Sequence, residues 1–222
     1  MEEIIAEKKE IPYINKFTFV GNVVHKYRPS PDIIVLTVAL DGKGVHDVDY
    51  PNVAFHGKEI ADAIDANVVV QKGNYPCMQI SGMVQTDRKM QDGKAVYYQN
   101  FVGTTIRKAA NNMETLSGVR GLGRRKAECQ NDICLLGEVS NVFQIMRPNG
   151  SNPIGYIITM RVLTEHVNFP KVTCFNQTMR MASTLKRGDV ICVTGFVETQ
   201  YRESAERRKR LESIIATEIE KA

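Results

Sequence analysis

Five stretches in the N-terminal half of this chain are rich in β-branched and aromatic residues, a composition typical of β-strands. They cover residues 17–27, 32–40, 50–56, 78–88 and 96–106. Between the third and fourth stretches, Ile60, Ala61 and Ile64 follow the spacing of a helix instead. The pattern therefore predicts five strands with one short helix after the third.

The C-terminal half repeats this pattern. The matched segments are SGMVQT (81–86) with TGFVET (194–199) at an offset of 113 residues, Asn15–Val23 with Asn131–Val139 at 116, and Tyr50–Val53 with Phe169–Val172 at 119. Ordered matches of this kind indicate a duplicated domain, and residues 178–186 supply its second helix. Because five strands with a helix after the third is the order of an OB-fold, we predict a mainly β protein. It has two tandem five-stranded OB-fold barrels, each with a short helix between strands 3 and 4.

The repeat also predicts the domain boundaries. An N-terminal arm covers residues 1–12, the first OB-fold 13–106, a basic linker 107–130 and the second OB-fold 131–222. The linker contains Gly118, Gly121 and Gly123 and little apolar periodicity, as expected of a flexible connection.

Composition narrows the class of protein. The hydrophobic share of 43% and charged share of 24% are ordinary for a globular protein. No apolar run approaches the roughly 20 residues that cross a bilayer, and the acidic start is unlike a secretory signal. We expect a soluble, cytoplasmic protein with no membrane segment. The five cysteines are odd in number and form no C-x-x-C pair, which argues against disulfides or a zinc site.

Positive charge is concentrated in one segment. Residues 107–128 contain six Lys and Arg and two Glu, so the net charge of this segment is +4, the same as that of the whole chain. The rest of the chain is neutral overall, so a polyanion site there depends on local arrangement. The basic linker itself either contacts a nucleic acid or serves as a tether.

Alternation on the third strand of each copy places similar side chains on its outer face. These are Tyr50, Asn52, Ala54 and His56 in the first copy, and Phe169, Lys171, Thr173 and Phe175 in the second. Exposed rings on a barrel strand suit single-stranded nucleic acid, because bases stack on them. Nearby cations would hold the phosphates, among them Arg28, Arg88, Lys89 and Lys94 in the first copy and Arg147, Arg202, Arg207 and Arg208 in the second. Alternatively, the rings only cover the barrel ends and the cations are solvated.

Short motifs along both copies resemble the bacterial single-stranded DNA-binding protein family. They are Asn15-Lys16 through Val20-Gly21-Asn22, Tyr27 with Pro29-Ser30, the FHGK stretch of 55–58, Lys72-Gly73, and Gly82 with Gln85-Thr86, followed in the second copy by Leu136-Gly137, Pro148 with Gly150, Arg187-Gly188, and Gly195 through Thr199. The resemblance implies protection of single-stranded DNA without catalysis, in an assembly of four OB-folds that this chain would reach as a homodimer.

Three departures from that family concern the site. The chain has no tryptophan for base stacking, it ends at Ala222 without the family's acidic tail, and the spacing from Gly73 to Gly82 is longer. These departures favour a specialised plasmid- or phage-borne protein. Our candidate nucleic-acid-binding residues are Tyr27, Arg28, Tyr50, Asn52, His56, Arg88, Lys89, Arg147, Phe169, Lys171, Phe175, Tyr201 and Arg202.

The sequence thus predicts largely sequence-independent binding of single-stranded DNA, with RNA also possible, in DNA replication, recombination or repair, without enzymatic activity or cofactor. The alternative is an adaptor of a replication or conjugation complex that binds proteins and little or no DNA. A metal-dependent nuclease would have to use the acidic loop from Asp41 to Asp49, which lacks the spacing of an EF-hand. We interpret that loop as a solvated connection.

Overall fold

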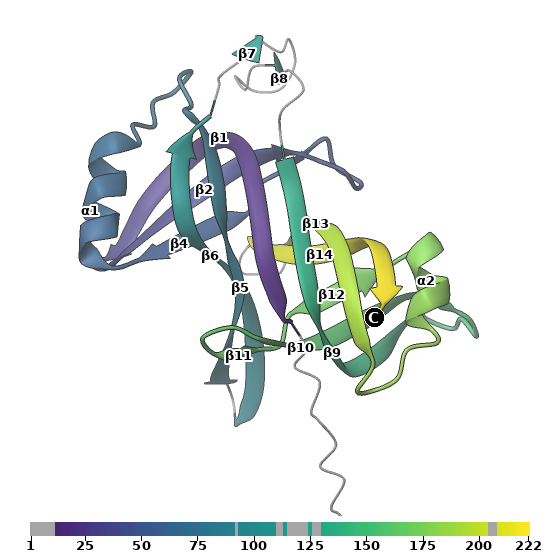
Figure 1. Ribbon diagram of the computed structural model, residues 1–222. Coiled ribbons are helices and arrows are strands. Elements are labelled where there is room, and N and C mark those ends of the chain that lie inside the picture. Colours follow the sequence, from purple (N-terminus) through teal and green to yellow (C-terminus); the bar gives the residue numbers. More distant parts are fainter. Residues whose placement is uncertain (1–11, 92, 110–112, 115–123, 126–129, 204–207) are drawn as a thin grey trace, which may run out of the picture.

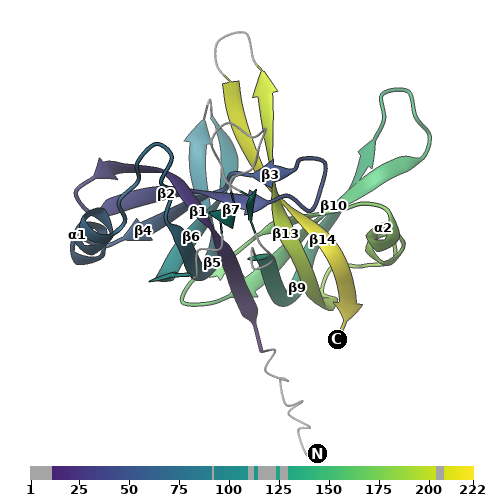
Figure 2. The same ribbon diagram turned by 90° about the horizontal axis from the view of Figure 1, so that it is seen from above.

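The computed structural model describes residues 12–91, 93–109, 113–114, 124–125, 130–203 and 208–222, and the chain is mainly β (Figure 1). Two α-helices occur in this part of the chain, α1 (Lys58–Asn67) and α2 (Gln177–Ala182). They lie at opposite ends of the molecule (Figure 2). Neither helix is long and apolar enough to cross a membrane.

Five strands in the N-terminal half close into a ring. They are β1 (Ile14–Ser30), β2 (Ile33–Asp41), β4 (Asn52–His56), β5 (Cys77–Gln91) and β6 (Lys94–Lys108). The order around the ring is β1, β2, β4, β6, β5 and back to β1, and every pair is antiparallel except β4 with β6. The short strand β3 (Val48–Asp49) pairs with β2. We call this set of five strands the N-terminal ring.

Five later strands repeat the arrangement. They are β9 (Gln130–Met146), β10 (Pro153–Leu163), β12 (Lys171–Cys174), β13 (Val190–Glu203) and β14 (Arg208–Lys221). They pair in the same order, with β12 and β14 as the parallel pair, and form the C-terminal ring. The short strand β11 (Val167–Asn168) pairs with β10. Between the rings, β7 (Met113–Glu114) pairs with β8 (Arg124–Arg125), while the rest of the predicted linker and most of the N-terminal arm lie outside the described residues.

The two rings have different interiors. In the N-terminal ring the side chains of Phe17, Phe19 and Phe101 are buried, and their ring centroids lie 4.5 to 5.4 Å apart. In the C-terminal ring most buried side chains are aliphatic or sulfur-containing, such as Leu135 and Met160, and Tyr156 is an aromatic member of the core. Full burial of each such residue contributes about 1.5–3 kcal/mol, so both interiors have enough apolar side chains to hold their strands together.

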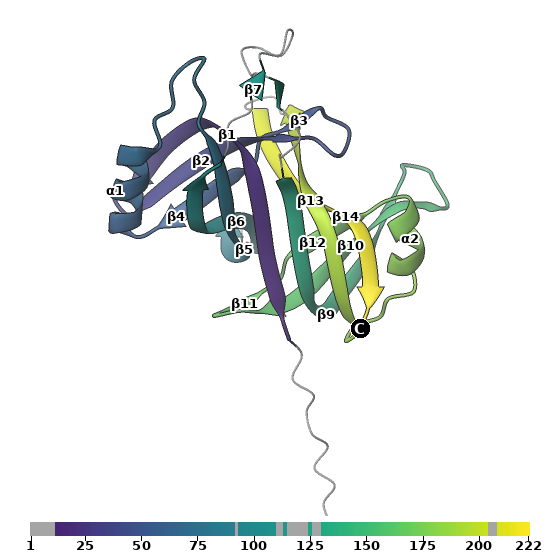
Figure 3. The same ribbon diagram turned by 45° about the horizontal axis from the view of Figure 1, so that its top comes forward.

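A single antiparallel pairing joins the rings into one twelve-stranded sheet. Strand β1 pairs with β9 from Ile14 opposite Leu136 to Val20 opposite Gln130. Figure 3 shows these two strands side by side in the middle of the molecule. Phe17 lies opposite Ile133, its own counterpart at the offset of 116. The strands therefore meet around a local two-fold axis.

The repeated segment has the same backbone role in each ring. The register shifts next to Gly82 and next to Gly195, as at a β-bulge. A Cβ atom on Gly82 would lie 2.0 Å from the Val102 carbonyl oxygen, and one on Gly195 would lie 2.3 Å from that of Ile215. No side chain fits at these distances, so both copies need glycine there.

Two asparagines extend the sheet with their side chains. The amide of Asn131 donates to the Val197 carbonyl and accepts from the Val197 N–H, both at 2.9 Å. Asn15 makes the same two bonds to Val84 at 2.8 Å. Each asparagine thus bonds the backbone just beyond the last strand pair, which is Phe17 with Gly82 in β1–β5 and Ile133 with Gly195 in β9–β13.

Replacing Asn131 with alanine should destabilise the protein. Asn131 is only 1% exposed, so the substitution leaves a buried N–H and a buried carbonyl unpaired, at a cost of about 1–3 kcal/mol for each group. Urea unfolding followed by circular dichroism measures the loss. The control is Asn141→Ala, which removes one exposed hydrogen bond to Val142, and an equal loss in the two variants would contradict this role.

Candidate nucleic-acid interface

The two rings exchange hydrogen bonds through the last residue of the repeated segment. The Thr199 hydroxyl oxygen accepts from the backbone N–H of Tyr50 at 2.9 Å. In the same way, the Thr86 hydroxyl oxygen accepts from the backbone N–H of Phe169 at 2.8 Å. Each threonine therefore holds the residue that precedes the third long strand of the other ring. We call the contact made by these reciprocal bonds the seam.

A second reciprocal pair lies one step further along the same strands. The backbone N–H of Asn52 donates to Glu212 Oε1 at 2.9 Å, and that of Lys171 donates to Gln99 Oε1 at 2.8 Å. Glu212 belongs to β14 and Gln99 to β6. The edges of β4 and β12 are thus capped by side chains from the opposite ring.

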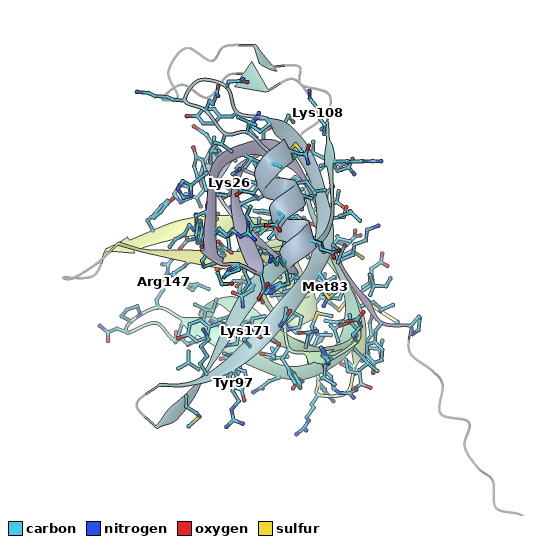
Figure 4. The ribbon with its side chains drawn as sticks, turned by 90° about the vertical axis from the view of Figure 1, so that its left-hand side faces the viewer. Lys26, Met83, Tyr97, Lys108, Arg147 and Lys171 are labelled. Carbon is cyan, nitrogen blue, oxygen red and sulfur yellow. The ribbon has the colours of Figure 1, made fainter. Side chains whose placement is uncertain are left out.

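An open groove of about 910 Å³ runs across the seam, and its walls come from both rings. Five of the thirteen candidate residues line it: Tyr27, Asn52, His56, Lys89 and Lys171. Figure 4 shows Tyr97 and Lys171, from different rings, close together on this face, with Arg147 off to one side. The packing of the two rings therefore brings together residues that are distant in sequence.

Aromatic and cationic side chains both line this groove. Tyr27 is 42% exposed and Tyr97 is 51% exposed, so both tyrosine side chains offer surface for stacking. The Lys89 ammonium lies 5.5 Å from the centroid of the Tyr98 ring, within the range of a cation–π contact. Exposed rings beside cations can hold bases and phosphates of a single strand.

The other candidate residues lie outside the groove. Arg28 forms an ion pair with Asp62 of α1 at 2.7 Å, and Tyr50 and Phe169 are half-buried beside the seam. Arg88 and Arg147 are exposed, as are Phe175 and Tyr201. Arg202 belongs to β13, but its side chain lies outside the described part of the chain, as do those of Lys94, Arg207 and Arg208.

Sequence reasoning missed several residues that line the groove, including Tyr97, Tyr98, Gln99, Arg210 and Glu212. Tyr97 and Tyr98 were within reach of the strand pattern, because adjacent residues on a strand point to opposite faces and one of two tyrosines must face outward. Arg210 and Glu212 had no such signal, since their position depends on how the rings pack.

One carboxyl group at the seam, that of Asp49, is fully buried, and a second, that of Glu212, is half-buried. Asp49 has no exposed surface, and its Oδ1 accepts the N–H and hydroxyl of Thr199 at 2.7 and 3.2 Å. Its Oδ2 has no hydrogen-bond partner among the described residues. Burial raises the pKa of Asp49, the bonds from Thr199 oppose that shift, and the nearby Glu198 adds to it. The counterpart of Asp49 is the neutral Asn168, whose Oδ1 accepts the Thr86 N–H at 2.9 Å.

Glu212 is the second of these carboxyl groups. Burial raises its pKa, while the bond from the Asn52 N–H and the charge of Arg210 lower it. Arg210 Nε lies 3.4 Å from Glu212 Oε1. Glu212 also lines the groove, as does Asp87, so the site contains acidic groups beside its cations.

The described residues hold no group of three or more His, Cys, Asp and Glu side chains that could bind a metal ion. In the acidic loop, the N–H of Val45 donates to Glu198 at 3.0 Å, so the loop packs against the C-terminal ring. Cys134, Cys174 and Cys192 are free thiols, and burial raises the pKa of Cys174 to about 12. Cys129 lies outside the described residues.

Comparison with solved structures identifies the fold. The single-stranded DNA-binding protein from Thermus aquaticus aligns with 95% of this chain and 93% of its own, with a TM-score of 0.62 and 15% sequence identity. A deletion variant of the same protein aligns at a TM-score of 0.61, covering 95% of each chain. No protein-family model and no curated protein sequence matches the chain. The predicted resemblance is thus confirmed for the fold, which is that of the OB-fold single-stranded DNA-binding proteins.

Replacing Asp49 with asparagine should stabilise the protein at neutral pH. A raised pKa means that the folded state binds more protons than the unfolded state between the ordinary and the raised value. The free energy of unfolding therefore falls as pH rises through that window. The amide keeps an acceptor for Thr199, as Asn168 does for Thr86, and cannot ionise.

Urea unfolding at a series of pH values checks this. The advantage of Asp49→Asn over the wild type should shrink as pH falls toward the ordinary aspartate pKa. Asp47→Asn, an exposed position in the same loop, is the control and should show no such trend. A wild type that is the more stable protein at neutral pH would contradict the assignment.

Proposed function

We propose that this protein binds single-stranded DNA without catalysing a reaction, largely independently of sequence. The observation that supports this most directly is the groove across the seam, where tyrosines and Lys89 of the N-terminal ring and Lys171 of the C-terminal ring line one open surface. Bases stack on the tyrosine side chains, and each stacked base gains about 1–3 kcal/mol of binding free energy. Phosphates pair with Lys89 and Lys171.

We propose further that each ring is an OB-fold barrel, so that the chain carries two in tandem at residues 13–106 and 131–222, separated by the basic linker. The closed pairing of five strands in each half supports this, as does the helix between the third and fourth long strand. A homodimer would then present four barrels. Such a protein acts in DNA replication, recombination or repair in the cytoplasm, and a plasmid or phage is the kind of genome that we expect to encode it.

The second candidate function is a protein-binding adaptor. Asp87 and Glu212 line the same groove as the lysines, and Arg28 is engaged with the acidic face of α1. These features lower the positive potential that single-stranded DNA needs. An adaptor would use the groove for a polypeptide of mixed charge.

Fluorescence anisotropy with end-labelled oligonucleotides separates the two functions. The strands are single-stranded DNA, its duplex and the matching RNA, each at low and moderate salt. The label belongs on the nucleic acid, because the chain has no tryptophan. Salt-sensitive binding to the single strand and little to the duplex supports the proposal, whereas no binding to any strand favours the adaptor.

Stacking in the groove predicts the effect of two substitutions. Tyr27→Ala and Tyr97→Ala should each weaken single-strand binding by about 1–3 kcal/mol while the fold stays intact. The control is Val69→Ala, which trims a side chain that is 55% exposed and does not line the groove. Unchanged affinity in both tyrosine variants would argue against stacking.

Phosphate contact predicts a change in salt dependence. Lys171→Gln keeps the backbone N–H bond to Gln99 and removes one cation, so the slope of log K against log salt should become shallower by about 0.7. Titrations at several salt concentrations measure it. Lys186→Gln removes an exposed cation that does not line the groove, and the same change of slope there would show that bulk charge is responsible.

A further inference from the structure

Gln99 and Glu212 occupy equivalent places on the two sides of the groove. They match at the offset of 113 that relates the repeated segments. The Oε1 atom of each accepts the backbone N–H at the start of the third long strand of the opposite ring, from Lys171 at 2.8 Å and from Asn52 at 2.9 Å. Oε1 therefore has the same structural role in Gln99 and in Glu212.

The second terminal atom differs in kind. Gln99 has an Nε2 amide, which donates, and Glu212 has an Oε2 oxygen, which accepts. Among the described residues neither atom has a hydrogen-bond partner. The buried side-chain atoms without a partner in this part of the chain are Arg28 Nε and Asp49 Oδ2. The free ends of Gln99 and Glu212 are therefore not fully buried, and both residues line the groove.

A carboxylate oxygen in a nucleic-acid groove discriminates between bases. Cytosine, adenine and guanine carry an exocyclic amino group, which donates outward from the ring, and Glu accepts from the amino group of cytosine. Thymine and uracil have one ring N–H donor, which lies between two carbonyl oxygens that repel a carboxylate. In a single strand these edges are unpaired and open to side chains.

We propose that Glu212 is a base-reading residue, and that its free carboxylate oxygen makes the groove prefer bases with an exocyclic amino group over thymine and uracil. This preference rests on the proposed binding of single-stranded DNA and is superimposed on binding that is otherwise independent of sequence. The side chain is positioned for this role before any strand binds, because the Asn52 N–H and the Arg210 guanidinium fix its other oxygen.

Charged groups around the carboxylate fit the same role. Arg210 Nε, 3.4 Å from Glu212 Oε1, offsets the charge of the carboxylate. Lys171 lines the groove as well and is available for a phosphate. Cations in the groove would thus hold the phosphates of a bound nucleic acid away from the carboxylate, while a base contacts the carboxylate.

Two oligonucleotides of equal length test the proposal, one of deoxycytidine and one of deoxyuridine. Their bases differ in the exocyclic group at C4 and in the protonation of N3. Competition anisotropy at mildly alkaline pH should show that the wild type binds the cytosine strand about 5- to 150-fold more tightly, the range of one good base contact. In Glu212→Gln the acceptor becomes a donor, while an oxygen remains for the Asn52 N–H. The ratio should then fall to about one or below.

Two further variants make the result specific. Glu165→Gln changes the same functional group at an exposed position that does not line the groove, and it should keep the wild-type ratio. Gln99→Glu adds a second acceptor and should raise the ratio, which keeps the test decisive if Glu212→Gln fails to fold.

Equal affinities of the wild type for the two strands would overturn the base-reading role and leave single-strand binding in place. A Glu212→Gln variant that weakens both strands by the same factor would overturn it as well. Failure of the wild type to bind either strand would overturn the proposed function, and the base-reading role with it.

Discussion

Four backbone N–H groups at the start of β4 and β12 find their acceptors across the seam, in the opposite ring. A buried N–H without a partner is costly, so each ring depends on the other to satisfy the strand that faces the groove. Thr86, Thr199, Gln99 and Glu212 supply the acceptors. Two of these side chains, Gln99 and Glu212, also line the groove, so the exchange helps to shape the surface between the two rings.

The repeated hexapeptide explains why part of this arrangement could be predicted from the sequence. Its glycine lies at a bulge that leaves no room for a Cβ atom. Its valine is buried in the core and its backbone bonds an asparagine amide. Its threonine accepts a hydrogen bond across the seam. Three independent requirements at fixed spacing preserve a recognisable segment. The mainly β class and the fold of single-stranded DNA-binding proteins could therefore be predicted from the chain alone.

Other features had no local signal. Polar residues beyond residue 88 do not show the alternation of a half-buried strand, yet β5 continues to Gln91 because it pairs with β6. On the third strand, alternation correctly indicated that Asn52, His56 and Lys171 face outward into the groove. It could not show that Tyr50 and Phe169 lie beside the seam instead, because their backbone bonds run to the other ring. Contacts between distant parts of a chain determine such positions.

The pairing of β1 with β9 has a consequence for assembly. An interface with a local two-fold axis ordinarily forms between separate molecules, and its occupancy then depends on protein concentration. Here both strands belong to one polypeptide, so the encounter is intramolecular and the two rings are present in equal number. Dilution does not separate them. The two sides of the interface are also encoded separately, which allows an ionisable Asp49 on one side and a neutral Asn168 on the other.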